Sequence, residues 1–339
     1  MKSSNLISKY SICGVLAGLL SISPASAQIF VADNTMVEKY TLAGADNGTT
    51  ANSATLVSGL NTALGVAVSG PDLFVLKSNG VGEYNATTGA TINASLIGGL
   101  SPTNFAIDDS GNLFVTNDVS GAGNATINEY TTGGAAANGS NPAILSGLTS
   151  PAGVAVYNNG NTHALFVTSS TNNSLTEYTL DTNGDGMYGV AAHGGTTTVI
   201  SSALTYPFNM VIAGSDLYFV NRNPPGLPTN PGSVDDYNIG AGTLNSSFIT
   251  DLNEPYGISV LGSDLYVTES MAGGTVAEYT TSGQSVNISS QYPTVTGVGY
   301  PAGIDVVSSL SAAPEPYSQA MGMIVVALFV VLRLRRRVA

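Results

Sequence analysis

The stretch Pro151-Ala-Gly-Val-Ala-Val156 is followed by Ala164-Leu-Phe-Val-Thr168 and then by Ser174-Leu-Thr-Glu-Tyr-Thr179. Each stretch is short, rich in β-branched or aromatic residues, and bounded by Gly, Asn or Ser. Such segments are typical of β-strands separated by tight turns. With a fourth stretch, Thr197-Thr-Val-Ile200, they form a unit of consecutive predicted strands.

This four-strand unit recurs along the chain. The first strand recurs as Leu64–Val68, Asn104–Ile107, Gly153–Val156, Asn209–Ile212, Gly257–Val260 and Gly303–Val306. The second recurs as Ile29–Val31, Leu73–Val75, Leu113–Val115, Leu165–Val167, Leu217–Phe219 and Leu265–Val267. The third ends on Tyr40, Tyr84, Tyr130, Tyr178, Tyr237 and Tyr279. A period of about 45 residues with four strands per unit is typical of a β-propeller blade.

The two ends of the repeat complement each other. The first unit begins at a second strand, Ile29–Val31, and one first strand, Gly303–Val306, is left over at the far end. Joined in one sheet, they leave no exposed edge strand, which protects a ring against edge-to-edge aggregation. We therefore expect an all-β protein, a six-bladed β-propeller over residues 28–311 that is closed by pairing of its N- and C-terminal strands.

Prolines stand just before most of the first strands, where a missing N–H group costs the sheet nothing. They are Pro102, Pro151, Pro207, Pro255 and Pro301. The recurring Tyr and Phe side chains are expected to pack between neighbouring blades. The acidic residue that precedes most of the tyrosines is expected to point outward into solvent, because side chains alternate between the faces of a strand.

The N-terminus is typical of a secretory signal peptide over residues 1–27. Lys2 and Lys9 precede an apolar stretch, Ile12–Leu20, and an Ala-Ser-Ala sequence ends at Ala27. That order predicts cleavage between Ala27 and Gln28. Cys13, the single cysteine of the chain, lies inside this signal, so the processed chain would hold no disulfide, thiolate metal site or cysteine nucleophile.

Residues 312–339 form a second sorting signal. Pro314, Glu315 and Pro316 are followed by an apolar run, Met321–Leu332, and then by an arginine cluster consisting of Arg333, Arg335, Arg336 and Arg337. Arginines retained on the cytoplasmic side would orient the hydrophobic helix with the body of the protein outside. The run is short for a permanent membrane span, which favours temporary anchoring.

This tail resembles the PEP-CTERM sorting signal of Gram-negative bacteria that make exopolysaccharide. The resemblance covers only the C-terminal tail, but its three parts stand in the same order. It implies that an exosortase recognises Pro314, Glu315 and Pro316, and that the arginine cluster retains the tail until processing. The protein would then be exported across the inner membrane, transiently anchored by its C-terminal helix, and delivered to the cell surface or the exterior. An ordinary single-pass anchor is the alternative.

Charge limits the partners of the processed chain. Outside the two predicted signals there are three basic residues, Lys39, Lys77 and Arg222, against 21 acidic ones, a net charge of about −18. Nucleic-acid binding depends on Lys and Arg contacts to phosphate, so nucleic acid is excluded as a partner. Anionic membrane is disfavoured for the same reason, which leaves membrane contact to the C-terminal helix alone. Cations and neutral extracellular polysaccharide remain the permitted partners.

Two sets of loops should meet at one face of the propeller, around its axis. We expect eight residues to form a ring at this mouth, six that follow the second strands and two that enter first strands. They are Asp33, Lys77, Asn117, Ser169, Asn221, Glu269, Asn104 and Asn209, with Asp118, Arg222 and Glu254 nearby. Such oxygen ligands could hold a hard cation, although an ordinary solvated channel explains the polar residues equally well.

Asp181, Asn183 and Asp185 offer a second cation candidate. The sequence Asp181-Thr-Asn-Gly-Asp-Gly186 matches the start of a calcium loop, in which alternate oxygens converge on the ion. Ala192 stands where the bidentate Glu of an EF-hand would be, so the match is partial, and a simple turn is the alternative. Calcium is therefore the one cofactor that the sequence suggests.

The blade pattern resembles the propellers of NHL and gluconolactonase-like proteins, folds that serve lyases, lactonases and binding modules alike. The sequence favours an extracellular or cell-surface binding or structural component of the exopolysaccharide or biofilm matrix, processed by exosortase. The alternative is a metal-dependent lactonase, hydrolase or lyase with its site at the propeller mouth. No local catalytic motif favours an enzyme.

Overall fold

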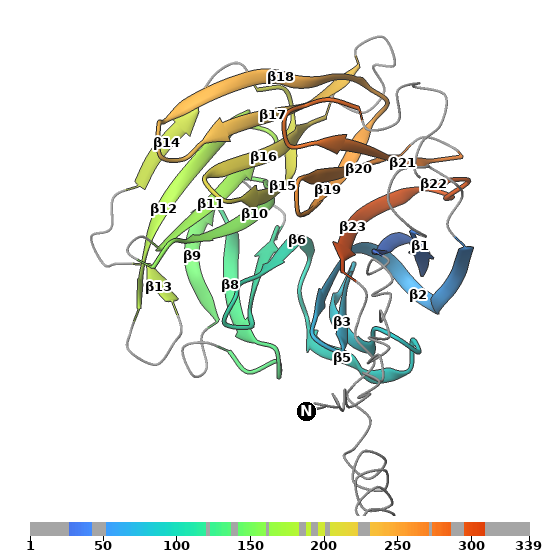
Figure 1. The fold of residues 1–339 in the computed structure, drawn as a ribbon. Coiled ribbons are helices and arrows are strands. Elements are labelled where there is room, and N and C mark those ends of the chain that lie inside the picture. The colour runs from blue at the N-terminus through green and yellow to red at the C-terminus, as the bar shows by residue number, and fades with distance from the viewer. Residues whose placement is uncertain are drawn as a thin grey trace, which may run out of the picture.

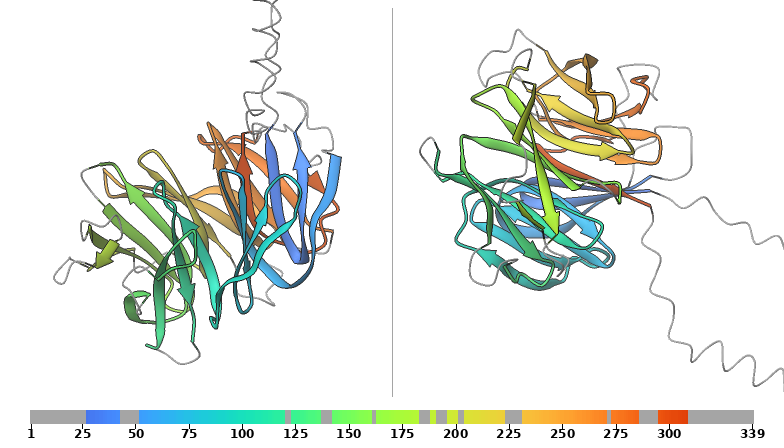
Figure 2. Two further views of the ribbon diagram at one scale, coloured as in Figure 1. Left: turned by 90° about the horizontal axis from the view of Figure 1, so that it is seen from below. Right: turned by 90° about the vertical axis from the view of Figure 1, so that its left-hand side faces the viewer.

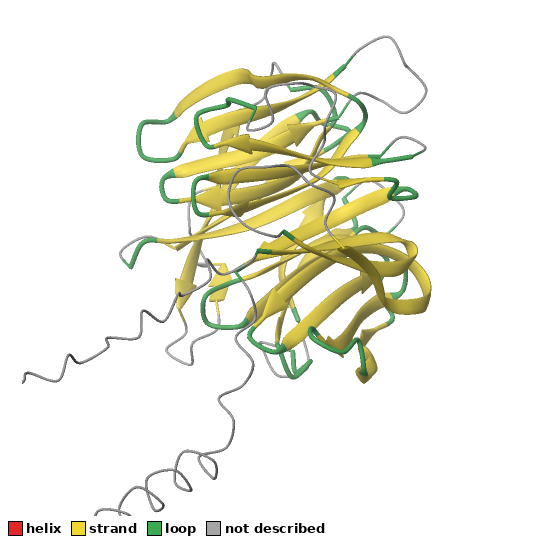
Figure 3. Cartoon of the chain, turned by 45° about the vertical axis from the view of Figure 1, so that its right-hand side comes forward, coloured by secondary structure: helices red, strands yellow, loops and turns green. Residues whose placement is uncertain are grey.

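The computed structural model describes residues 27–42, 52–119, 123–136, 142–160, 163–182, 188–190, 196–200, 204–222, 231–270, 273–285 and 295–308. Within these residues the secondary structure is β-sheet, and the sheets stand around a common axis (Figure 1). Views from two further sides show the sheets fanned about that axis (Figure 2). Turns and loops join the strands at the ends of the sheets (Figure 3). The predicted all-β propeller is confirmed.

Five sheets are present among the described residues. The largest has the order β23-β1-β2-β3-β4-β5, with bounds β1 Gln28–Thr41, β2 Asn52–Ser69, β3 Asp72–Lys77, β4 Gly80–Asn85, β5 Thr91–Gly98 and β23 Pro301–Val307. The next along the chain has the order β6-β7-β8-β9, with bounds β6 Pro102–Ile107, β7 Asn112–Asn117, β8 Ala125–Thr131 and β9 Ala143–Leu148.

The other three sheets follow in chain order. The first contains β10 Pro151–Asn158, β11 His163–Ser169, β12 Ser174–Thr182 and β13 Tyr188–Val190, with β14 Thr196–Ile200 also paired to β12. The second contains β15 Pro207–Ala213, β16 Asp216–Asn221, β17 Gly232–Asn238 and β18 Thr243–Leu252. The third contains β19 Pro255–Leu261, β20 Asp264–Glu269, β21 Thr275–Thr280 and β22 Val295–Thr296. All strand pairs in these sheets are antiparallel.

The predicted first strands line the axis as a closed ring. Their order around the axis is β2, β6, β10, β15, β19 and β23, and β23 in turn contacts β2. Hydrogen bonds between neighbouring sheets hold this inner rim. Thr168 Oγ1 donates to the Phe208 carbonyl at 2.8 Å, and Thr268 Oγ1 donates to the Ala302 carbonyl at 2.8 Å.

The terminal strands close this ring. Gln28 pairs with Val307, Ile29 with Val306, and Val31 with Ile304, all antiparallel. The predicted pairing of the first and last strands is therefore present. Five of the predicted first strands begin at a proline, and in each of them that proline is the first residue of the strand, as expected.

The prediction of six separate blades is wrong, because the structure has five sheets. β1 pairs with β23 through residues 28–33 and with β2 through residues 36–41. β2 then continues to Ser69 and pairs with β3. The first two predicted units thus share one hydrogen-bonded sheet. The turns between their strands, at Asn34 and at Gly59–Thr62, are short bends with positive φ that do not interrupt it.

The second strands form the core between sheets. Leu73, Phe74, Val75 and Leu76 are all buried, because one face of β3 packs against residues of β1 and β2 and the other against the β6–β9 sheet. The equivalent aromatic residues of the other repeats are also buried, namely Phe30, Phe114, Phe166, Tyr218 and Tyr266. The predicted packing role of the recurring aromatic residues is therefore confirmed.

The acidic residues before the tyrosines differ from the prediction. Glu129 is fully buried, with an exposed fraction of 0%, and Glu83, Glu177, Asp236 and Glu278 are half-buried. Burial raises the pKa of Glu83, Glu177 and Asp236. The expectation of solvated acids is therefore wrong for Glu129, while the other four keep part of their surface exposed.

The two predicted sorting signals lie outside the described residues. These are the signal peptide up to residue 26 and the tail over residues 312–339, with its hydrophobic helix. Within the described ranges, no helix has the length and apolar character needed to cross a bilayer.

Truncation at the C-terminus tests how the ring is closed. We expect removal of residues 309–339 from a chain that starts at Gln28 to leave Tm unchanged, because β23 ends at Val307. Removal of residues 301–339 should abolish cooperative unfolding, because β1 loses its partner strand and Ile304 and Val306 leave the core. Circular dichroism on heating measures both, and equal transitions in the two truncations would contradict closure by β23.

Candidate binding site in the central channel

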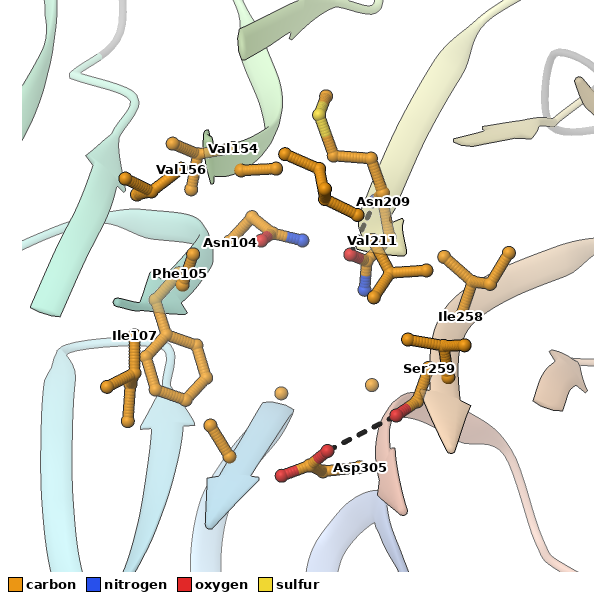
Figure 4. Close-up of a pocket in the computed structure, with 18 of the residues that line it drawn as sticks. Asn104, Phe105, Ile107, Val154, Val156, Asn209, Val211, Ile258, Ser259 and Asp305 are labelled. Atoms are coloured by element: carbon orange, nitrogen blue, oxygen red, sulfur yellow. Dashed lines mark hydrogen bonds between the residues drawn. The ribbon is translucent and has the colours of Figure 1, made fainter. Parts of the chain in front are cut away.

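The inner strands enclose a channel with a cavity of about 640 Å³. Its walls are formed by all the inner strands, and the side chains that face it are mostly apolar, including Phe105, Val154, Val211 and Ile258 (Figure 4). The polar residues of this lining within the strands are Asn104, Asn209, Ser259, Asp305 and, at the end of β10, Asn158. Asp108 and Asp109 line the cavity just beyond the end of β6, and no Lys or Arg is among its lining residues.

Asn104 and Asn209 occupy equivalent positions on β6 and β15 and extend toward each other across the channel (Figure 4). The other inner strands have Gly at this position, and two of these glycines show why. A Cβ atom at Gly153 would lie 2.0 Å from the Phe208 carbonyl oxygen, and one at Gly303 would lie 2.5 Å from the Cα of Gly65. Neighbouring sheets approach too closely there for a side chain, so only the two asparagines project from this level.

The Asn104 side chain has unused hydrogen-bonding capacity. The residue has an exposed fraction of 6%, yet its amide has no partner among the described residues. The Asn209 Oδ1 accepts a hydrogen bond from the Met210 backbone N at 2.7 Å, which leaves its Nδ2 group free for another acceptor. Neither amide is among the buried side-chain groups that lack a hydrogen-bond partner, so both are open to the cavity that they line. Two amides with unused donors and acceptors that face one cavity form a candidate site for a polar ligand.

Asp305 stands on the opposite wall of the channel, on β23. Its carboxylate accepts hydrogen bonds from the Val68 N at 2.7 Å, from the Val306 N at 2.9 Å and from the Ser259 Oγ at 3.2 Å. These bonds join β23 to β2 on one side and to β19 on the other. Burial raises the pKa of Asp305, and the hydrogen bonds it accepts act in the opposite direction but are the smaller effect.

The predicted mouth ring divides into two groups. Asn104 and Asn209 line the channel, whereas Asp33, Lys77, Asn117, Ser169, Asn221 and Glu269 are absent from its lining. Each of these six pairs with the first residue of the adjacent inner strand, which is a proline in five cases and Ala63 in the sixth. These six residues therefore occupy equivalent positions in the repeat, as predicted. Their side chains form hydrogen bonds to the nearby backbone instead of facing the channel.

These bonds fix the loop that leads into each inner strand. Asn117 Oδ1 accepts from the Ser101 N at 2.8 Å, and Glu269 Oε1 accepts from the Asn253 N at 2.9 Å. Asp33 accepts from the N atoms of Gly299 and Tyr300 at 3.0 and 2.8 Å.

The same position in other sheets uses related contacts. Asn221 Oδ1 accepts from the Thr205 N at 3.3 Å, and Ser169 Oγ donates to the Thr149 carbonyl at 2.7 Å. Lys77 instead donates to the Ala94 carbonyl. Acid, amide and hydroxyl side chains perform one task here, which explains why this position is always polar but varies in identity. The three predicted neighbours, Asp118, Arg222 and Glu254, also lie outside the channel lining.

A second cavity of about 340 Å³ lies against β17 and β18. Asp235, with an exposed fraction of 1%, borders it and accepts hydrogen bonds from Asn221 at 2.5 Å, from Ser233 at 3.1 Å and from the Ser247 N at 2.8 Å. All these bonds are internal. The site therefore has a complete structural explanation.

Asp305 and Ser259 were missed by sequence reasoning. A signal for both was available, because the equivalent residues of the other inner strands are Ala67, Ala106, Ala155 and Val211. A carboxylate at a position that is otherwise small and apolar indicates a buried polar contact or a ligand.

The predicted calcium loop is described only in part. Asp181 lies in β12 and pairs with Gly189 of β13, while Asn183 and Asp185 fall outside the described residues. Across the described ranges, no group of three or more His, Cys, Asp or Glu side chains is placed to hold a metal ion. In the channel, side-chain oxygen ligands for a hard cation could come from Asp305, Asn104, Asn209, Asp108 and Asp109, together with backbone carbonyls and water.

No family model matches this chain, and no curated protein is significantly similar to it in sequence. Solved structures do resemble it. A protein of unknown function from Bacteroides caccae has a TM-score of 0.52 at 11% identity, with coverage of 83% of this chain and 99% of that one. TolB from Acinetobacter baumannii has a TM-score of 0.52 at 15% identity, with coverage of 84% and 67%.

A third likeness is to regucalcin, a calcium-binding protein from Agrobacterium tumefaciens. Its TM-score is 0.50 at 14% identity, with coverage of 69% of this chain and 75% of that one. Identities this low establish shared architecture only. The fold and its axial cavity make this chain a β-propeller protein.

Stability should rise on mild acidification. Burial raises the pKa of Glu83, Glu177, Asp235, Asp236 and Asp305, so each binds its proton more tightly in the folded than in the unfolded chain. For Asp305, the stability linked to its proton is fully present below its ordinary pKa of 3.8 and is lost as pH rises through the raised, folded-state pKa. We expect Tm to increase between about pH 7 and about pH 5.

Asp305→Asn should make this pH dependence shallower, because the variant has no proton to gain at this position. Asp109→Asn, at an exposed position beside the same cavity, is the matched control and should keep the wild-type slope. Thermal unfolding followed by circular dichroism across pH measures both. A Tm that falls on acidification in this range would contradict the burial of these acids.

Proposed function

We propose that this protein is an exported, exosortase-processed β-propeller that binds extracellular polysaccharide, with its central channel as the binding site. The observation that carries the proposal is the Asn104 amide, which extends into the channel without a hydrogen-bond partner among the described residues. A ligand with hydroxyl groups would supply the missing donors and acceptors.

The chemistry of the channel favours a neutral, hydroxylated ligand. The amides of Asn104 and Asn209 can donate and accept, while the partly exposed Phe105 and Val211 offer apolar surface against which a sugar ring could pack. The charged side chains that line the cavity are acidic, which disfavours a ligand that is anionic within the channel. A cavity of about 640 Å³ suits one or a few sugar units rather than a long chain.

Export is supported by the way the ring relates to the two sorting signals. β1 begins at Gln28, immediately after the expected signal-peptide cleavage, and β23 ends at Val307, before Pro314. Cleavage at both sites would therefore leave every strand of the ring intact. We propose delivery to the cell surface or the exterior as part of the polysaccharide or biofilm matrix.

Binding in the channel can be tested with neutral oligosaccharides released from the exopolysaccharide of the producing cell. We expect Asn104→Leu combined with Asn209→Leu to weaken their binding about tenfold or more, because each variant removes hydrogen bonds at similar side-chain volume. Isothermal titration calorimetry measures the affinity.

Asn245→Leu, on the exposed face of β18, is the matched control and should bind as the wild type does. Equal affinity in the channel variant and the control would contradict a site in the channel. Failure of the wild type to bind any neutral oligosaccharide from this source would do the same.

Export is tested separately by removing residues 314–339 in the producing cell. We expect the shortened protein to be secreted across the inner membrane but retained in the periplasm, because the exosortase motif is gone. Immunoblotting of periplasmic, surface and medium fractions measures this, with a variant that replaces only residues 309–312 as the control. Unchanged surface delivery of the shortened protein would contradict exosortase processing.

A second candidate is a metal-dependent lactonase, hydrolase or lyase, with calcium in the channel. The observation in its favour is the Asp305 carboxylate on the wall opposite the two amides, which supplies one anionic oxygen ligand to neutral ones. Bound oligosaccharide that is recovered chemically changed, and only in the presence of calcium, would favour this activity. Ligand recovered unchanged favours the binding function.

A further inference from the structure

Basic side chains are scarce in the body of the protein, and two of the three have a structural partner. Lys39 Nζ donates to the Ala86 carbonyl at 3.2 Å and lies 5.2 Å from the centre of the Phe30 ring. Lys77 Nζ donates to the Ala94 carbonyl. The guanidinium of Arg222 donates no hydrogen bond to any described residue.

Aromatic rings hold the Arg222 side chain in place. Its guanidinium carbon lies 4.7 Å from the centre of the Tyr256 ring and 5.7 Å from that of Phe208. The two rings contact each other edge to face, with their centres 4.6 Å apart. Cation–π contacts of this kind fix the plane of a guanidinium without using its N–H groups. The two rings therefore fix the position of the guanidinium, while its N–H groups make no hydrogen bond to the part of the chain that the structure describes.

The guanidinium of Arg222 contains a buried N–H donor without a hydrogen-bond partner in the described part of the chain. The Arg222 Nε is buried and lacks an acceptor, and a buried donor without a partner costs about 1–3 kcal/mol. A carboxylate is the group that best matches a planar guanidinium, because two parallel N–H groups can bind its two oxygens. No carboxylate among the described residues is paired with Arg222 in this way.

The position of Arg222 links it to the channel. Arg222 follows β16, and its ring partner Phe208 directly precedes Asn209, whose side chain faces the cavity. Tyr256, the other ring, directly precedes Gly257 at the same level of the next inner strand. The guanidinium thus lies beside the entrance to the inner strands on the side where Asn104 and Asn209 project.

We infer that Arg222 is a subsite for the carboxylate of an acidic sugar, and that the channel ligand carries a uronate at this end. This inference rests on the proposed function, since it assigns the charge of one sugar unit in the same ligand. The channel itself suits neutral units, while Arg222 supplies a cation that Phe208 and Tyr256 hold in place. A chain of net charge near −18 would otherwise repel such a ligand, so the preference depends on this one residue.

The test compares a disaccharide of one neutral sugar and one galacturonate unit with its methyl ester, which has the same rings but no charge. We expect the wild type to bind the acid about tenfold more tightly than the ester, and Arg222→Gln to remove that preference while leaving ester affinity unchanged. Arg222→Lys should retain only part of the preference, because an ammonium keeps the charge but loses the paired N–H geometry. Isothermal titration calorimetry on the full processed chain measures the affinity of each of these proteins for both ligands.

Lys77→Gln is the matched control, because it removes one positive charge after β3 at the position equivalent to Asn221, next to Arg222. It should keep the full preference for the acid. Equal binding of acid and ester by the wild type, an unchanged preference in Arg222→Gln, or an equal loss in Lys77→Gln would each overturn the subsite.

The same measurements separate the subsite from the proposed function. Ester binding that still depends on Asn104 would leave the proposed function standing, whereas no binding of either probe would overturn both. A Tm for Arg222→Gln equal to the wild-type value shows that the fold is intact, and Arg222→Lys serves in its place where it is not.

Discussion

The pairing of β1 with β23 is the interaction on which the rest of the structure depends. The two strands come from opposite ends of the propeller sequence, and Gln28 lies opposite Val307 in the ladder that joins them. Without this ladder, the inner strands would form an open arc with two exposed edges. Asp305 strengthens the closure, because its carboxylate links β23 to the strands on both sides. The channel therefore exists only while the ends are joined.

Close approach of the inner strands determines which side chains reach the channel. At the level of Asn104 and Asn209, the remaining inner strands have Gly, and at Gly153 and Gly303 backbone atoms of the neighbouring sheet occupy the space that a side chain would need. The channel thus presents the amides of Asn104 and Asn209 on one side and the Asp305 carboxylate with the Ser259 hydroxyl on the other. This arrangement is what makes the channel a candidate ligand site.

Much of the fold could be predicted from the sequence because its signals are local and repeated. The Leu-Phe-Val strands, the prolines before inner strands and the unpaired strands at the two ends all indicated a closed propeller. The number of separate sheets could not be predicted in the same way. It depends on whether hydrogen bonding continues through short bends such as the one at Asn34, which the repeat pattern does not report.

The candidate site was predicted in part, for a related reason. Asn104 and Asn209 stood out because they replace Gly in a repeated position, and steric exclusion makes such a replacement informative. Asp33, Asn117 and Glu269 were grouped with them because varied polar residues can indicate a ligand ring. The structure shows another reason for their variation. Any side chain with an acceptor oxygen can bind the backbone N–H groups of the loop before the proline, so the identity of the residue can vary. The role proposed for Arg222 could not be predicted from the sequence, because it depends on the cation–π contacts with Phe208 and Tyr256.

The most direct test of this account is a crystal structure of the processed chain, residues 28–313, soaked with neutral oligosaccharide from the producing cell. The account predicts a sugar unit in the central channel, hydrogen-bonded to the side-chain amides of Asn104 and Asn209. Sugar bound only on the outer surfaces of the sheets, with the channel amides contacting water alone, would contradict it.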